Sequence, residues 1–116
     1  MRDDRDRGAI TVELALTLPA VVALMAILLA AGSAAVNQIA LTAAARAGAR
    51  AAALGLADAE VEAAAEAVGG TLTISVSRGD GLVTVKCGRQ VAIPPFGSRA
   101  VRAEAAAMCE PARGCG

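Results

Sequence analysis

One run of uncharged residues, 14–45, constrains this chain more than any other feature. Its most apolar part, 14–36, would measure roughly 35 Å as an α-helix, at about 1.5 Å per residue. The hydrocarbon core of a bilayer is about 30 Å thick, so this segment is long enough to cross it. Pro19 lies within the segment, where membrane helices tolerate a proline. The segment predicts a single membrane-spanning helix.

A cleaved secretory signal is the alternative explanation of the same segment. Small residues near its end offer cleavage sites after Ala31, Ala34 or Ala35. The apolar region of such signals usually has about 7–15 residues, and this one is longer. We therefore expect the helix to be retained.

The composition excludes several classes of function. The 116 residues suffice for one small domain. The absence of histidine removes the commonest general base and the commonest metal ligand. The 11 basic and 11 acidic residues balance, so net charge does not point to nucleic acid as the main partner. We expect no catalytic residue, no metal site and no cofactor, and do not expect an enzyme.

A short polar leader precedes the apolar run. Residues 1–8 carry three arginines and three aspartates, and Glu13 follows Gly8 by five positions. A carboxylate within a membrane helix costs about 2.5–3.5 kcal/mol on insertion scales and marks a functional residue. The alternative is that Glu13 lies in the headgroup layer, where the helix begins.

The order of polar leader, Gly8, Ala9, Glu13 and apolar helix resembles the class III signal of type IV prepilins. The sequence of residues 8–19, GAITVELALTLP, is similar to that of the TadE-like pilins of tight-adherence (Flp-type) systems. The Ala/Arg-rich segment 43–53 resembles actinobacterial members. Most prepilin leaders carry net positive charge, and this leader departs from that pattern.

The resemblance implies a structural and assembly subunit, a minor pilin or pseudopilin of a Tad/Flp-type IV pilus or related secretion system. It implies cleavage between Gly8 and Ala9 by a prepilin peptidase, and pairing of Glu13 with the new amine of a neighbouring subunit. Its partners would be that peptidase, other pilin subunits through the N-terminal helix, and the assembly platform in the inner membrane. The N-terminus would be cytoplasmic and the head extracytoplasmic, in a single-pass protein that can be incorporated in a surface pilus. The alternative is a small membrane-anchored or Sec-secreted binding protein with no pilus role.

We expect an α+β, pilin-like fold in three parts: the leader 1–8, a long helix 9–56 with its membrane span at 14–36, and a small head 57–116. Gly55 should interrupt the long helix, and Asp58 should act as the N-cap of a short helix. The apolar stripe of that helix and the glycines that end it are Val61, Ala64, Ala65, Val68, Gly69 and Gly70.

From Thr71 onward the apolar residues alternate, which predicts strands. A turn at 78–81 joins the first two strands; it contains Arg-Gly-Asp, an integrin-binding tripeptide that a hairpin also needs for backbone reasons. Residues 100–110 alternate as well, which favours a third strand over a helix. The core of the resulting antiparallel sheet would hold about ten aliphatic residues and Phe96. Six basic and three acidic residues follow Gly70, which leaves room for contact with anionic surfaces.

All three cysteines lie in the head, which fits an oxidising compartment. If Ile93 faces Ala103 across the connection between the last two strands, Cys87 faces Cys109. This register predicts a Cys87–Cys109 disulfide. Cys109–Cys115 and Cys87–Cys115 are the alternatives.

Overall fold

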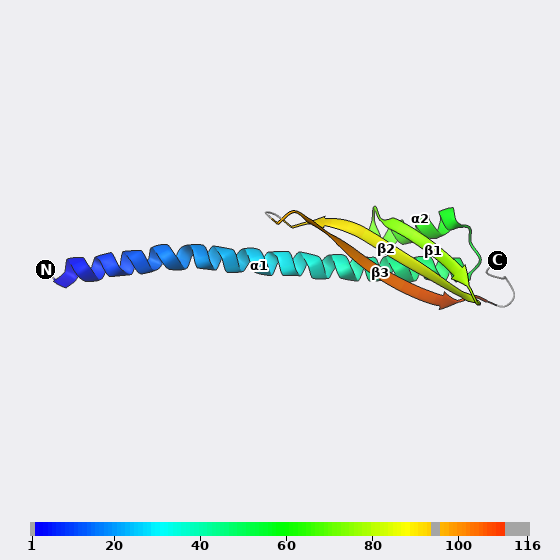
Figure 1. Cartoon of the computed structure of the whole chain (residues 1–116), viewed down its shortest axis with the longest axis horizontal. Coiled ribbons are helices and arrows are strands. Elements are labelled where there is room, and N and C mark those ends of the chain that lie inside the picture. The colour runs from blue at the N-terminus through cyan, green and yellow to red at the C-terminus, as the bar shows by residue number, and fades with distance from the viewer. Residues whose placement is uncertain (1, 94–95, 111–116) are drawn as a thin grey trace. The chain divides into compact units, whose positions relative to one another are not determined.

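The computed structural model describes residues 2–93 and 96–110, and their side chains from Asp4 onward. The elements, in order, are α1 (Arg2–Ala53), α2 (Asp58–Gly69), β1 (Thr73–Gly79), β2 (Leu82–Ala92) and β3 (Ser98–Met108) (Figure 1). The predicted α+β class is therefore confirmed. The chain divides into two compact units, an N-terminal unit that ends at Ser33 and a head unit that begins at Ala34.

Helix α1 is longer at its start and shorter at its end than the predicted 9–56. It begins at Arg2, and Asp4 and Asp6 lie near the positive end of the helix dipole. It ends at Ala53, followed by Gly55 at a φ of 79°. The amides of Gly55 and Leu56 donate to the carbonyl oxygens of Ala52 and Ala51, at 3.0 and 3.3 Å, which is a Schellman motif. Gly55 thus ends the helix as predicted.

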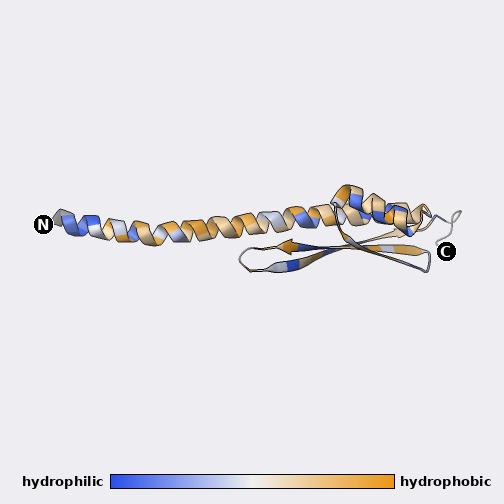
Figure 2. Cartoon of the chain, turned by 90° about the horizontal axis from the view of Figure 1, so that it is seen from above, coloured by the Kyte–Doolittle hydropathy of each residue, from blue (hydrophilic) through white to orange (hydrophobic). Residues whose placement is uncertain are grey.

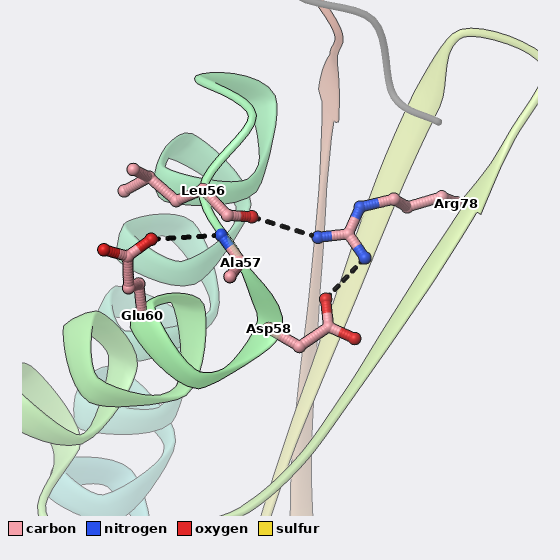
Figure 3. Close-up of polar contacts among 5 residues, drawn as sticks. All are labelled: Leu56, Ala57, Asp58, Glu60 and Arg78. Atoms are coloured by element: carbon pink, nitrogen blue, oxygen red, sulfur yellow. Dashed lines mark hydrogen bonds and ion pairs between the residues drawn. The ribbon is translucent and has the colours of Figure 1, made fainter.

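The start of α2 differs from the prediction that Asp58 caps it. Ala57 is the N-cap, and its amide donates to a carboxylate oxygen of Glu60 at 3.1 Å. Asp58 instead forms an ion pair with Arg78 of β1, which also donates to the carbonyl oxygen of Leu56 at 3.3 Å (Figure 3). The arginine of the Arg-Gly-Asp tripeptide therefore holds the corner between the two helices.

One face of α2 packs on α1. Val61 and Ala65 are buried as predicted, but Val68 is 51% exposed. Gly69 is buried in its place, because a Cβ there would lie 2.8 Å from the Cβ of Ala44 on α1. The apolar stripe of α2 therefore ends on Gly69, which has no side chain to keep the two helices apart.

The three strands form an antiparallel sheet in the order β1-β2-β3. Asp80 and Gly81 join β1 to β2 with φ angles of 53° and 74°. Two positive φ angles in a two-residue loop define the type I′ turn, whose twist matches that of the strands. Residues 98–108 form a strand, which confirms the sheet prediction over the helical alternative.

The core of the head lies between the sheet, α2 and the alanine-rich end of α1. Gly48 marks the closest approach: a Cβ there would lie 3.0 Å from the Cγ1 of Val85 and 3.5 Å from the Cβ of Ala65. Small side chains on α1 thus let the sheet approach the helix backbone. The buried hydrophobic residues are Leu41, Ala44, Ala45, Ala49, Ala51, Ala52, Val61, Ala65, Val83, Val85, Cys87 and Ala103.

Phe96 does not belong to this core, contrary to the prediction. Its side chain is 84% exposed, in the loop between β2 and β3. The space between α1 and the sheet is filled by aliphatic side chains, of which Leu41, Val61 and Val85 are among the largest fully buried ones. Because the sheet lies close to the alanines of α1, the core has no space for an aromatic ring.

Arg89 of β2 connects three elements of the head. Its Nη1 donates to the Oδ1 of Asn37 on α1 at 3.0 Å, and its Nη2 donates to the carbonyl oxygen of Gly69 at the end of α2. Nearby, the Nε2 of Gln38 donates to the carbonyl oxygen of Arg102 on β3 at 3.3 Å. These contacts fix β2 and β3 to α1 at the start of the head unit.

The register of β2 and β3 overturns the predicted cysteine pairing. Cys87 lies opposite Ala103, and the loop is closed by the pair Ala92 and Ser98. The amide of Cys109 donates to the carbonyl oxygen of Gly81, at 2.9 Å. Gly81 is six positions from Cys87, about 20 Å along a strand, whereas a disulfide needs Cα atoms within about 7 Å.

The predicted Cys87–Cys109 disulfide is therefore not formed. Cys87 is a free thiol, 1% exposed, and Cys109 is disulfide-bonded. Both lie on the inward phase of the sheet, as expected, with Cys109 half-buried. Cys115, which takes part in both alternative pairings, lies outside the described residues.

The contact at Gly48 predicts a large effect of added volume. Gly48→Leu should lower the free energy of unfolding of the head by about 1–3 kcal/mol, because the new side chain must displace Val85 and Val61. Urea denaturation of the full chain in detergent micelles measures it. Gly32→Leu is the matched control, since nothing lies within 4 Å of a Cβ at that helical glycine. Equal stability of the two variants would contradict this packing.

The buried thiol predicts a pH dependence. Burial raises the pKa of Cys87 above its ordinary value, so the folded state keeps the proton while the unfolded thiol ionises. The contribution of Cys87 to stability should be complete below the ordinary thiol pKa and be lost as pH rises through the folded pKa. Unfolding measured across alkaline pH tests this, with Cys87→Ala as the control that lacks the slope. Iodoacetamide should modify Cys87 slowly until the head unfolds; rapid labelling of the native protein would refute its burial.

Candidate processing and assembly site

The residues predicted to act in processing lie on one helix. Gly8 and Ala9 are both exposed in the first turns of α1, and nothing lies within 4 Å of a Cβ at Gly8. Glycine in a helix costs about 1 kcal/mol relative to alanine, so the helix opens more easily here than at its neighbours. The Gly8–Ala9 peptide bond is therefore accessible from the side and lies where local opening is least costly.

Glu13 is the only charged residue between Arg7 and Arg46. Its side chain is exposed, and within the part of the chain that the structure describes its carboxylate has no ion-pair partner. Ala9 and Glu13 are four residues apart, which places them on the same helix face with a rise of about 6 Å. The carboxylate thus lies one turn from the residue that would become the N-terminus after cleavage.

The hydroxyl groups near Glu13 are satisfied by the helix itself. Thr11 Oγ1 donates to the carbonyl oxygen of Arg7 at 2.8 Å, and Thr17 Oγ1 donates to that of Glu13 at 2.8 Å. Ser33 Oγ likewise donates to the carbonyl oxygen of Ala30 at 2.9 Å. Glu13 differs from these residues, because its charge is not compensated by a neighbour in the helix.

The apolar side chains around Glu13 are exposed on every side of α1. This helix is long and apolar enough to cross a bilayer, and none of its most apolar stretch is buried. Figure 2 shows the polar leader at the N-terminal end and mostly apolar residues along the helix that follows. Up to residue 29, the large hydrophobic side chains with 53–75% exposure are Ile10, Val12, Leu14, Leu16, Leu18, Val21, Val22, Leu24, Met25, Ile27, Leu28 and Leu29.

The head carries a hollow on its sheet. Its volume is about 580 Å³, and its lining includes Lys86, Gln90, Arg102 and Glu104 from β2 and β3. Lys86 and Glu104 form an ion pair at 3.8 Å. Among the residues that the structure describes, no three histidine, cysteine, aspartate or glutamate side chains are grouped as metal ligands would be.

The predicted site residues fall into two separate sets. Gly8, Ala9 and Glu13 lie in the N-terminal unit, whereas Cys87 and Cys109 lie in the head unit and are not opposite each other. Arg89, which fixes the sheet to both helices, was not singled out by the sequence. One signal could have indicated the role of Arg89. It is a charged residue at a position of β2 where the alternation places side chains toward the core.

Comparison with known protein families gives a match for part of helix α1. Residues 8–50 match the model of a family described as TadE-like protein. No curated protein and no solved structure matches the chain. The matched segment begins at Gly8, includes Ala9 and Glu13, and reaches into the alanine-rich part of α1 that packs in the head. Residues 8–50, 43 of the 116 residues, are similar to TadE-like proteins.

Proposed function

We propose that the chain is a structural subunit, a minor pilin or pseudopilin, of a Tad/Flp-type IV pilus or a related secretion system. One observation carries the proposal: Glu13, five positions after Gly8, has no ion-pair partner among the described residues, and the large apolar side chains around it, from Ile10 to Leu29, are exposed. The family match over the same residues supports it. TadE-like pilins form a structural family, and we propose no enzymatic activity.

The exposed helix needs an apolar environment that the chain itself does not supply. Burying a valine, leucine, isoleucine or methionine side chain gains about 1.5–3 kcal/mol, so the dozen exposed ones between Ile10 and Leu29 strongly favour a bilayer or a bundle of similar helices. Residues 14–36 would occupy the membrane before assembly. In the assembled pilus, the same side chains would pack against the helices of other subunits.

Glu13 would then set the position of each subunit. Cleavage by a prepilin peptidase after Gly8 creates an α-amine at Ala9, and the Glu13 carboxylate of one subunit would pair with the amine of a neighbour. An unpaired charge in a low dielectric costs far more than a paired one. Subunits displaced along the helix axis would leave both charges unpaired and would be rejected.

The orientation of the protein follows from the head. The balanced leader gives no positive-inside signal of its own. The disulfide at Cys109 supports a head in an oxidising compartment, outside the cytoplasm. The leader would then be cytoplasmic, where the peptidase and the assembly platform of the inner membrane meet it.

A secreted binding protein is the second candidate. The division between Ser33 and Ala34 favours it, because it coincides with the predicted secretory cleavage sites. Cleavage after Ala34 or Ala35 would keep Asn37 and every buried residue of the head. The N-terminus of the mature protein therefore distinguishes the two candidates.

Processing after Gly8 predicts a mature protein that begins at Ala9. Mass spectrometry of the protein from the cell envelope measures this directly. Gly8→Val should leave the full-length precursor, because the peptidase must accept the small residue at the cleaved bond. Gly32→Val, a change at another exposed helical glycine, should be processed normally. A mature chain beginning after Ala31, Ala34 or Ala35 would establish the secretory reading instead.

Removal of the Glu13 carboxylate should impair assembly and leave cleavage and insertion unchanged. Glu13→Ala and Glu13→Gln should be cleaved and inserted normally, because removing the carboxylate makes insertion easier by about 2.5–3.5 kcal/mol. Incorporation of this subunit into sheared surface pili should fall, as measured by immunoblot. Glu62→Gln, an exposed glutamate of the head, is the control. Unchanged incorporation of the Glu13 variants would refute the pairing.

A further inference from the structure

The hollow on the exposed face of the sheet is formed around a glycine in the middle of β2. Gly88 lies between Thr73 of β1 and Arg102 of β3 in the sheet register, and all three residues line the hollow. Gly88 has no positive φ, and a Cβ there would make only ordinary contacts, the nearest at 3.7 Å. A glycine inside a strand often marks a place where another backbone approaches closely. The described head therefore does not require a glycine at this position, but a larger side chain would fill the hollow.

Two cationic side chains of the hollow lie at a defined separation. Lys86 is directly opposite Glu104, and Arg102 lies two residues from Glu104 on the same face of β3. Diagonal neighbours of this kind are about 7–8 Å apart. Lys86 and Glu104 form an exposed ion pair at 3.8 Å, whereas Arg102 has no ion-pair partner among the described residues. Positive charge is therefore in excess among the outward-facing side chains of the hollow.

The exposed side of α2 has the complementary charge. The helix contains four acidic residues and no basic one. Glu62 and Glu66 are exposed, and neither forms an ion pair with a described residue. They are four residues apart on the helix, so they share a face at a rise of about 6 Å, close to the separation of the two cations. Ala59 and Ala63 beside them are exposed as well, so only small side chains lie between the carboxylates and the helix backbone.

The two surfaces lie at the same level of the head. Val85 of β2 and Val61 of α2 meet at Gly48 of α1, where both lie within 3.6 Å of the position of a Cβ. Lys86 and Glu62 directly follow these two valines and are exposed. From this level, β2 and α2 both run toward the beginning of the head part of α1. Parallel copies placed side by side therefore bring the exposed side of α2 to the level of the hollow.

The exposed side of α2 does not face the hollow of its own chain. Val61 and Ala65 face the core that Val85 also enters, so the opposite side of α2 points away from the sheet. A contact between the two surfaces must join two copies. It is heterologous, because the hollow of one copy receives the helix of the next. Such a contact extends into a row of copies unless the row closes into a ring.

We propose that the hollow binds the acidic side of α2 from a second copy of this chain. In this contact Lys86 meets Glu62, and Arg102 meets Glu66 one helical turn further along. Charges that complement each other at a matched spacing favour one alignment over others. Gly88 lets the helix approach the strands. The contact uses the head alone, so it goes beyond the proposed function and does not depend on the N-terminal unit.

Cysteine cross-linking of the full chain in detergent micelles tests which surfaces meet. Ser75→Cys lies in the hollow, and Ala63→Cys lies on the exposed side of α2. A mixture of the two variants should form several-fold more disulfide-linked dimer than either variant alone, because the contact joins unlike surfaces. Ala106→Cys is the matched control, since it is exposed on the same face of the sheet but outside the hollow; it should not link to Ala63→Cys. The unsubstituted chain corrects for linkage through the native cysteines.

Three results would overturn the contact. The first is equal linkage in the test and control mixtures. The second is linkage of Ser75→Cys with itself at the level of the mixture, which would identify a sheet-to-sheet pair. The third is loss of linkage in Glu13→Ala, which would mean that the N-terminal helices hold the copies together. The mature N-terminus and incorporation into pili test the proposed function separately, so a missing cross-link refutes this contact alone.

Filling the hollow provides a second measurement. Gly88→Val should reduce the cross-link of the mixture several-fold, because the valine side chain occupies the space that the helix would enter. The head should remain folded, since a Cβ fits at this position and valine favours strands. Urea denaturation of the variant checks the folding. Undiminished linkage in a folded Gly88→Val protein would refute the assignment of the hollow.

Charge reversal tests the alignment of the two copies. Arg102→Glu and Glu66→Arg should each reduce the cross-link several-fold, and the two changes in one chain should restore it, because the pair forms again with opposite signs. Arg99→Glu, at an exposed arginine on the other face of β3, should have no effect. Added salt should weaken the linkage of the parent, because it screens exposed charges. If the double variant links as poorly as the single ones, Arg102 and Glu66 are not partners and the proposed contact is wrong.

Discussion

The size of the side chains along α1 determines how the rest of the chain is organised. From Ile10 to Leu29 the helix carries large apolar side chains that no described residue of the chain covers. From Leu41 onward it carries alanines and Gly48, and there the sheet and α2 come into van der Waals contact with it. The first part can be satisfied only by lipid or by other helices, and the second only by the head. One continuous helix thus belongs to two environments.

The helices, turns and strands were predicted correctly where the local amino-acid sequence determines them. The apolar length of 14–36 requires a helix, and Gly55 ends that helix because it accepts a positive φ. Asp80-Gly81 predicts the hairpin for the same reason. The alternation after Ala100 showed the third strand, although its alanines alone favour a helix. Gly8 and Glu13 stay predictions from spacing and resemblance, because the groups that would act on them belong to other molecules.

The register of β3 was predicted wrongly because its inward residues are nearly interchangeable. Val101, Ala103, Ala105 and Ala107 all face the core, so a shift of six residues keeps every one of them on the same side. A register shift by an odd number of residues would have turned these side chains toward solvent. The alternating pattern excludes odd shifts but not even ones. The cysteine pairing depended on the register and was lost with it. Phe96 was assigned to the core by its hydrophobicity, whereas the narrow space above the alanines excludes it.

The dependence of the head on α1 has a consequence for how the protein is made. Gly48 and its neighbours leave the ribosome well before Val85 and Ala103, which cover them. The N-terminal part of the helix would enter the membrane during this interval, while the alanine-rich part waits on the far side without a partner. In the proposed topology the head would close only after β3 had crossed the membrane, so translocation of the last strand would complete folding. A chain stalled before that strand would leave the alanine-rich face of α1 uncovered.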